Sequence, residues 1–131
     1  MKISIITLFP KMISGFLAES IVKRAQDKAL VTIEIINLRD FAVDSYGTVD
    51  DRPYGGGAGM VLKVEPVLMA LEKVRAQNSN LQTTILTSAK GKVFNQQKAQ
   101  ALAKLEHLII VAGHYEGVDE RIMDQVDEEI S

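Results

Sequence analysis

Two glycine-bearing segments carry the residues best suited to chemistry. GHYEGVDER spans residues 113–121, and RPYGGGAGM spans residues 52–60. In the first, Tyr115 offers a ring for stacking, and Glu116 offers a carboxylate for an amine or a metal-bound water. Gly113 follows an apolar run and has no Cβ, so a ligand could approach its backbone. A structural turn would explain the same residues, and the two interpretations stay open.

The segment RPYGGGAGM matches neither common phosphate-binding pattern. It lacks the Gly-Lys-Ser/Thr ending of a P-loop, and it does not show Gly-x-Gly-x-x-Gly between a strand and a helix. A flexible hinge is the alternative explanation. The bulky residues Pro53, Tyr54 and Met60 argue against a simple linker.

Several charged residues have ordinary structural explanations. Asp119 is placed to cap a following helix, and Glu120 with Arg121 suggests a solvated pair. The acidic segment 124–129 predicts a solvated face or the start of a loop, and it does not argue for paired catalytic carboxylates.

The two histidines differ in their setting. His107 begins an apolar run and is expected to be structural, whereas His114 lies between a glycine and a tyrosine after that run and is the better site candidate. Two isolated histidines without cysteine do not suggest a zinc site.

Length and composition indicate one globular domain over residues 1–131. Apolar residues make up 47% of the chain, cysteine is absent and the formal charge is −2. No stretch approaches the roughly 20 apolar residues of a membrane span. We therefore expect a soluble cytoplasmic protein, in which nucleic-acid binding would need a local basic face.

The hydrophobic pattern alternates between strands and helices. Strands are predicted over residues 2–9, 31–38, 83–88 and 107–113, with a long loop over 39–60. Helices are predicted over 12–28, opened by Pro10, from 65 onward, and through 103 with Asn95 as the cap. Ile13, Phe16, Leu17 and Ile21 form the apolar face of the first helix, and AKGK turns the chain out of the third strand. This order predicts an α/β fold with a mainly parallel sheet and helices on both faces.

In such a sheet, ligands bind beyond the carboxyl ends of the strands. The loop holding RPYGGGAGM, the segment SAKGK and the segment GHYEGVDER each follow a predicted strand. All three contain glycine and polar groups, so a site is expected where they meet.

Four motifs together carry a resemblance that covers the whole chain. ISIITLFPKM, INLRDFAVD, VDDRPYGGGAGMVLKVEP, and GHYEGVDERI followed by VDEEIS resemble the bacterial tRNA (guanine-N1)-methyltransferases. These enzymes belong to the SPOUT class, whose members have a trefoil knot. The resemblance implies a SPOUT-like, Rossmann-type domain and methyl transfer from S-adenosylmethionine to N1 of the guanosine 3′ of the anticodon. It also implies tRNA as substrate and a homodimer with shared active sites.

The resemblance assigns roles to particular residues. Leu86, Thr87 and Ser88 would form one wall of the cofactor pocket, and Gly113, Tyr115, Glu116 and Gly117 would form another. The target guanosine would lie near Asp50, Arg52, Gly55, Gly56, Gly57 and Gly59, where bare backbone leaves room.

The chain also departs from the family pattern. The family usually has arginine in place of His114 and Pro-Gln in place of Ala89-Lys90, so the fine contacts of the pocket are expected to differ. The knot-closing loop, the general base and the RNA-binding domain are expected beyond Ser131, which predicts an incomplete knot and no catalytic base within residues 1–131. The resemblance also implies a possible dependence on Mg²⁺, which these residues by themselves do not predict.

Two other functions remain open. The chain could be a non-catalytic folded or dimerising module, or a nucleotide-binding α/β protein unrelated to RNA.

Overall fold

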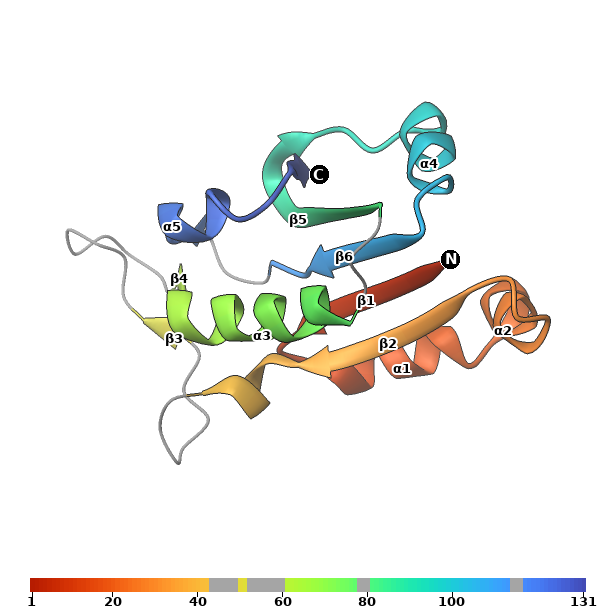
Figure 1. Ribbon diagram of the computed structural model, residues 1–131, viewed down its shortest axis with the longest axis horizontal. Helices are drawn as coiled ribbons and strands as arrows, with labels where there is room; N and C mark the ends of the chain where they lie inside the picture. The colour runs from red at the N-terminus through yellow and green to blue at the C-terminus, as the bar shows by residue number, and fades with distance from the viewer. Residues whose placement is uncertain (43–49, 52–60, 78–80, 114–116) are drawn as a thin grey trace.

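The computed structural model describes residues 1–42, 50–51, 61–77, 81–113 and 117–131 (Figure 1). Its main sheet has five strands in the order β2-β1-β6-β5-β8, all paired in parallel. The strands are β1 (Lys2–Thr7), β2 (Thr32–Asn37), β5 (Gln82–Lys92), β6 (His107–Val111) and β8 (Glu128–Ile130). The predicted α/β class with a mainly parallel sheet is confirmed.

One face of the sheet is covered by helix α3 (Val64–Ala76), which lies in front of the strands in Figure 1. Val67, Leu71 and Val74 are at most 1% exposed, as the helical spacing of these residues predicts. They pack with Ile6 of β1 and Ile109 of β6, two neighbouring interior strands. This cluster is the main core of the protein.

Helices α1 (Pro10–Leu17) and α4 (Gln96–Leu102) lie on the opposite side, α1 behind β2 in Figure 1. The predicted cap of α4 is confirmed, because Asn95 Oδ1 accepts a hydrogen bond of 2.8 Å from the Lys98 backbone N–H. Leu102 at the end of α4 packs on Ile85 and Leu108. Helices therefore cover both faces.

The predicted opening of the first helix at Pro10 is confirmed, but its continuity through residue 28 is wrong, because the chain forms two helices. α1 ends at Leu17, and α2 (Ser20–Asp27) starts at a residue with φ of 55°. Neither helix has a fully buried residue, and Phe16 and Ile21 are 68% and 73% exposed. Of the predicted apolar face, Ile13 and Leu17 are half-buried, whereas Phe16 and Ile21 remain largely exposed.

The turn predicted for AKGK is also wrong. These residues stay extended as the second half of β5, which curls around β8 in Figure 1. Ile130 of β8 is paired with both Thr87 and Lys92, across an irregularity in the ladder. A Cβ on Gly91 would lie 2.5 Å from the Ile130 backbone, so glycine permits this close wrap.

Short elements make up the remaining structure. They are η1 (Leu38–Phe41), β3 (Asp50–Asp51), β4 (Val61–Leu62), β7 (Gly117–Val118) and α5 (Glu120–Met123). β3, β4 and β7 form a second, three-stranded sheet. The predicted loop over 39–60 thus contains one 3₁₀ turn and one short strand among its described residues.

The acidic segment 124–129 is not simply a solvated face. Asp127 Oδ2 accepts a 2.8 Å hydrogen bond from the Thr84 backbone N–H, and Lys98 Nζ lies 2.8 Å from Glu128 Oε1. Glu128 and Glu129 belong to β8. The segment is acidic yet paired because the neighbouring strand β5 and helix α4 supply donors that the local sequence does not reveal.

Candidate functional site

The ends of β5 and β6 bring two of the predicted cofactor walls into contact. The last ladder pair between these strands joins Leu86 to Val111. Just beyond it, the Gly113 backbone N–H donates a 2.9 Å hydrogen bond to Thr87 Oγ1. Two segments 26 residues apart in the sequence therefore meet at the carboxyl edge of the sheet.

The reason for a glycine at position 113 differs from the one expected. A Cβ on Gly113 would lie 2.3 Å from the Thr87 carbonyl oxygen. The chain's own backbone, rather than a ligand, occupies the space that a side chain would need. Gly113 also uses its N–H on Thr87, so the polar backbone group that it could offer to a ligand is its carbonyl.

The other residues of the first wall present different groups. The Leu86 side chain is 1% exposed and belongs to the main core, so it can contribute only backbone to a site. The half-buried Ser88 accepts a 3.1 Å hydrogen bond from the Lys90 backbone N–H and keeps its hydroxyl proton as a donor.

The second, small sheet links the two glycine-bearing motifs. β4 follows RPYGGGAGM directly and pairs in parallel with β7, with Val61 opposite Gly117. β3 pairs with β4 on its other side, with Asp50 opposite Leu62. Asp50 and Gly117 thus lie in one three-stranded sheet. Several predicted site residues lie outside the described residues: Arg52, Gly55, Gly56, Gly57, Gly59, His114, Tyr115 and Glu116.

Asp119 has the capping role that its position predicts. Its carboxylate accepts a 2.9 Å bond from the Arg121 backbone N–H and pairs with the Arg121 guanidinium at 2.9 Å. The hydrogen bonds from Arg121 hold the pKa of this carboxyl below its usual value. The expected pair of Glu120 with Arg121 is therefore wrong, because Arg121 turns back to the cap residue.

His107 is structural, as expected. It is fully buried, and its Nε2 lies 2.8 Å from Ser4 Oγ in the neighbouring strand. Burial lowers the pKa of the imidazole, the positive charge of Lys2 lowers it further, and Glu34 partly opposes both. The neutral ring is a packing element of the core and does not reach the carboxyl edge of the sheet. In the described part of the chain, no group of three or more His, Asp or Glu residues is arranged to hold a metal ion.

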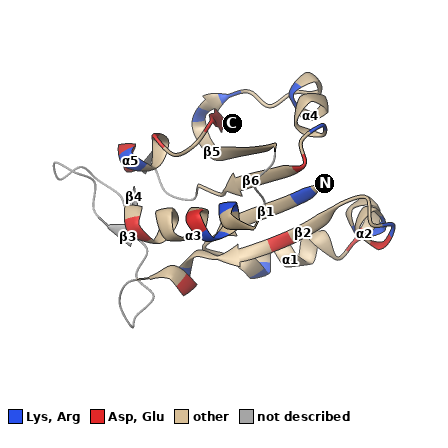
Figure 2. Ribbon diagram, in the orientation of Figure 1, with Lys and Arg blue, Asp and Glu red and all other residues tan. Residues whose placement is uncertain are grey.

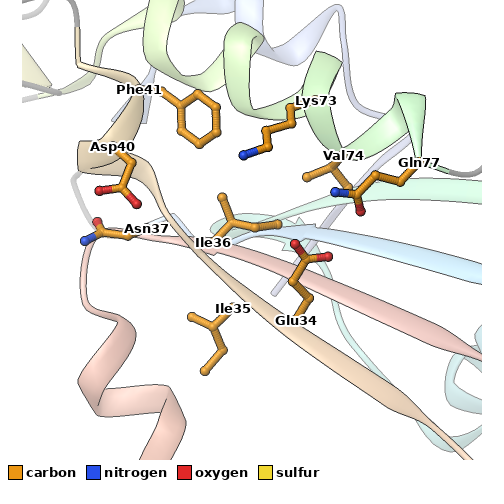
Figure 3. A pocket seen from close by; sticks show the side chains of 9 residues that line it. All are labelled: Glu34, Ile35, Ile36, Asn37, Asp40, Phe41, Lys73, Val74 and Gln77. Atoms are coloured by element: carbon orange, nitrogen blue, oxygen red, sulfur yellow. The ribbon is translucent and has the colours of Figure 1, made fainter.

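A separate hollow of about 160 Å³ lies between the edge strand β2, η1 and the second half of α3 (Figure 3). Ile36 and Val74 are buried at its base, and Lys73 points toward the Phe41 ring, with Nζ 5.6 Å from the ring centroid. Its rim carries Glu34, Asn37, Asp40 and Gln77. None of the predicted site residues lines it. Sequence reasoning missed this hollow because its walls come from three segments without a shared motif.

Charged residues of both signs occur along the described part of the chain. Figure 2 marks the charged residues on the ribbon, and α2, α3 and α5 each carry residues of both signs, whereas α4 carries only a basic residue and β8 only acidic ones.

Comparison with known proteins gives this arrangement a context. A parallel five-stranded sheet with helices on both faces defines an open α/β domain, a class in which ligands bind beyond the carboxyl ends of the strands. The chain belongs to one family of such proteins, because the model of the family described as tRNA (Guanine-1)-methyltransferase TrmD matches residues 1–131.

Individual relatives agree with this assignment. The chain is 54% identical to the tRNA (guanine-N(1)-)-methyltransferase of Carboxydothermus hydrogenoformans and 52% identical to that of Mycoplasma mycoides, with all of this chain matched. These matches cover 51% and 54% of the two relatives, so the chain spans about half their length. The crystal structure of the tRNA (m1G37) methyltransferase from Aquifex aeolicus superposes with a TM-score of 0.91 at 41% identity. That match covers 100% of this chain and 59% of the other.

Proposed function

We propose that this chain is the cofactor-binding part of an S-adenosylmethionine-dependent tRNA (guanine-N1)-methyltransferase. The observation that carries the proposal is the meeting of Thr87 and Gly113 at the carboxyl edge of the sheet, in a chain that matches this family over its full length. The class of reaction is methyl transfer to N1 of the guanosine 3′ of the anticodon.

The cofactor would lie against the ends of β5 and β6. Leu86 would contribute backbone, Ser88 its hydroxyl and Gly113 its carbonyl. Such hydroxyl and carbonyl groups fit the ribose and amine groups of a nucleoside ligand. Tyr115, Glu116 and Gly117 would complete this wall. When bound, S-adenosylmethionine supplies an electrophilic methyl group on a sulfonium.

The target guanosine would lie between this wall and the glycine-rich segment. Asp50 and Arg52 would contact the nucleotide, and Gly55, Gly56, Gly57 and Gly59 would leave room for it. The pairing of β3, β4 and β7 supports this placement, because it sets Asp50 and Gly117 in one sheet. Guanine N1 carries a proton near neutral pH, so transfer needs a general base, and we assign that role to no residue of this chain.

A second copy of the chain is the partner we propose, in addition to tRNA. Met12 and Phe16 are 73% and 68% exposed, and they lie four residues apart on one face of α1. Ile21 of α2 is 73% exposed. Exposed apolar side chains of this size on adjacent helices are typical of a protein interface.

The proposed location rests on the proposed reaction, and the proposed metal dependence rests on the family alone. We propose that the protein works in the cytoplasm, where tRNA is its substrate, and that Mg²⁺ assists the transfer as in the family. Separately, no helix in the described segments is long and apolar enough to cross a membrane.

Two measurements on this chain test the proposal. The first is calorimetric titration with S-adenosylmethionine, with ATP and NAD as competing ligands. The second is transfer of labelled methyl to a tRNA transcript with guanosine 3′ of the anticodon, with the Carboxydothermus hydrogenoformans relative as the positive control. We expect S-adenosylmethionine to bind and ATP and NAD to be ignored.

The outcomes separate the three candidate functions. Cofactor binding without transfer agrees with the proposal, because no general base is assigned within the chain. Binding of ATP or NAD in place of S-adenosylmethionine would favour an unrelated nucleotide-binding protein. Self-association without binding any of the three ligands would favour a dimerising module.

A further inference from the structure

Thr87 occupies a junction of three segments. Its backbone pairs with Ile130 of β8, and its carbonyl oxygen lies where a Gly113 side chain would be. Its hydroxyl accepts the Gly113 N–H at 2.9 Å. One residue thus joins β5, β8 and the chain that leaves β6.

The main chain at Thr87 is held firmly. β5 curls around β8, and the Ser131 N–H donates a 2.8 Å bond to the Lys92 carbonyl. Gly91 permits this wrap by letting the Ile130 backbone approach. Because the strand is fixed on both sides of Thr87, its hydroxyl presents an acceptor at a fixed place.

Beyond the last ladder pair, Leu86 with Val111, the backbone of β5 no longer bonds to that of β6. The Thr87 side-chain hydroxyl adds one further hydrogen bond between β5 and the segment that follows β6. Because that bond ends on Gly113, it sets the separation between the two strand ends.

We propose that Thr87 is a positioning residue for the cofactor site. Its hydroxyl fixes the Gly113 backbone, and this keeps the two strand ends at the separation that receives S-adenosylmethionine. The inference rests on the proposed function, and it gives Thr87 a role exerted through Gly113 in place of the direct cofactor contact that the family resemblance implies.

The variant Thr87→Val tests this role, because valine has nearly the same shape but cannot accept a hydrogen bond. The Gly113 N–H then lacks its partner, and the strand ends populate other separations. If about a tenth of the molecules keep the competent arrangement, the apparent affinity for S-adenosylmethionine falls about tenfold. Thr87→Ser restores the hydroxyl and should bind within about twofold of the unmodified chain.

A matched control comes from the same strand. Thr83 is half-buried in β5, and its hydroxyl makes no hydrogen bond within the described residues. Thr83→Val therefore makes the same chemical change without touching Gly113, and it should leave affinity unchanged.

The experiment combines two readouts on these four proteins. Calorimetry gives the affinity for S-adenosylmethionine, and amide hydrogen exchange by NMR gives the protection of the Gly113 N–H. We expect weaker binding and faster Gly113 exchange in Thr87→Val alone. Equal binding by Thr87→Val and the unmodified chain would overturn the positioning role.

Failure of the proposed function has a different signature. If the unmodified chain does not bind S-adenosylmethionine, the proposed cofactor site is wrong and the positioning role falls with it. If the unmodified chain binds but the hydroxyl makes no difference, only the positioning role is wrong.

Discussion

At the scale of single residues, Gly113 has a neighbour that leaves no room for a side chain. Gly113→Ala would place Cβ 2.3 Å from the Thr87 carbonyl, so backbone must move. We expect the free energy of unfolding to fall by about 1–3 kcal/mol, as for other overpacked sites. Urea unfolding measures this change.

A second glycine provides the control. A Cβ on Gly15 in α1 would meet nothing within 4 Å. Gly15→Ala should therefore raise the free energy of unfolding by about 0.5–1 kcal/mol, because alanine favours the helix. Equal effects of the two substitutions would contradict the close contact at Gly113.

His107 makes stability depend on pH. Burial holds its folded pKa below the unfolded value of about 6.5, so the unfolded chain takes up a proton first as pH falls. The free energy of unfolding should be independent of this group above about pH 6.5 and should fall below it. The measurement is urea unfolding from pH 7.5 to 5.5, with the His107 ring signals followed by NMR. A His107 pKa at or above 6.5 in the folded protein would contradict this expectation.

At the scale of elements, the end of α2 has a residue in an unfavourable conformation. Ala29 has φ of 57°, and the Leu30 N–H donates to the Ala25 carbonyl, which closes the helix in a Schellman arrangement. Glycine adopts this conformation without steric cost. Ala29→Gly should raise the free energy of unfolding by about 1 kcal/mol, measured as a higher urea midpoint. A lower midpoint would show that the left-handed conformation at Ala29 is not formed in solution.

The start of α4 depends on its cap. Asn95→Ala removes the acceptor of the Lys98 N–H, and we expect a loss of about 1 kcal/mol in the free energy of unfolding. Gln97→Ala, at an exposed position of the same helix, is the control and should change little. A cap that contributes nothing would leave the two variants equally stable.

At the scale of the whole molecule, the exposed apolar face of α1 is the interface through which we propose that the chain dimerises. Phe16→Asp puts a charge on this face, so the proposed dimer should dissociate while the monomer keeps its fold, because Phe16 is 68% exposed. Ser14→Asp adds the same charge about half a turn around the helix from Met12 and from Phe16, and it should leave the dimer intact. Sedimentation velocity measures both. A monomeric unmodified chain would contradict the proposed dimer.

Much of the fold could be predicted because its signals are local. The strand at the start of the chain, the strand over 31–38 and the buried stripe of Val67, Leu71 and Val74 each follow from hydrophobic periodicity within one segment. The cap at Asn95 likewise needs only the residue itself and the next turn. The family could also be identified from its motifs, since residue types at fixed spacing are a property of the chain alone.

Only the tertiary structure decided what happens between distant segments. The sequence AKGK predicts a turn, but these residues stay extended because Ile130 pairs with Lys92 across the curl of β5. The sequence predicts that a ligand approaches Gly113, but the Thr87 carbonyl occupies the space that a Gly113 side chain would fill. In both places the deciding contact joins residues far apart in the chain. The pattern of residues within one segment cannot predict such contacts, because they stabilise the chain only after the sheet has formed.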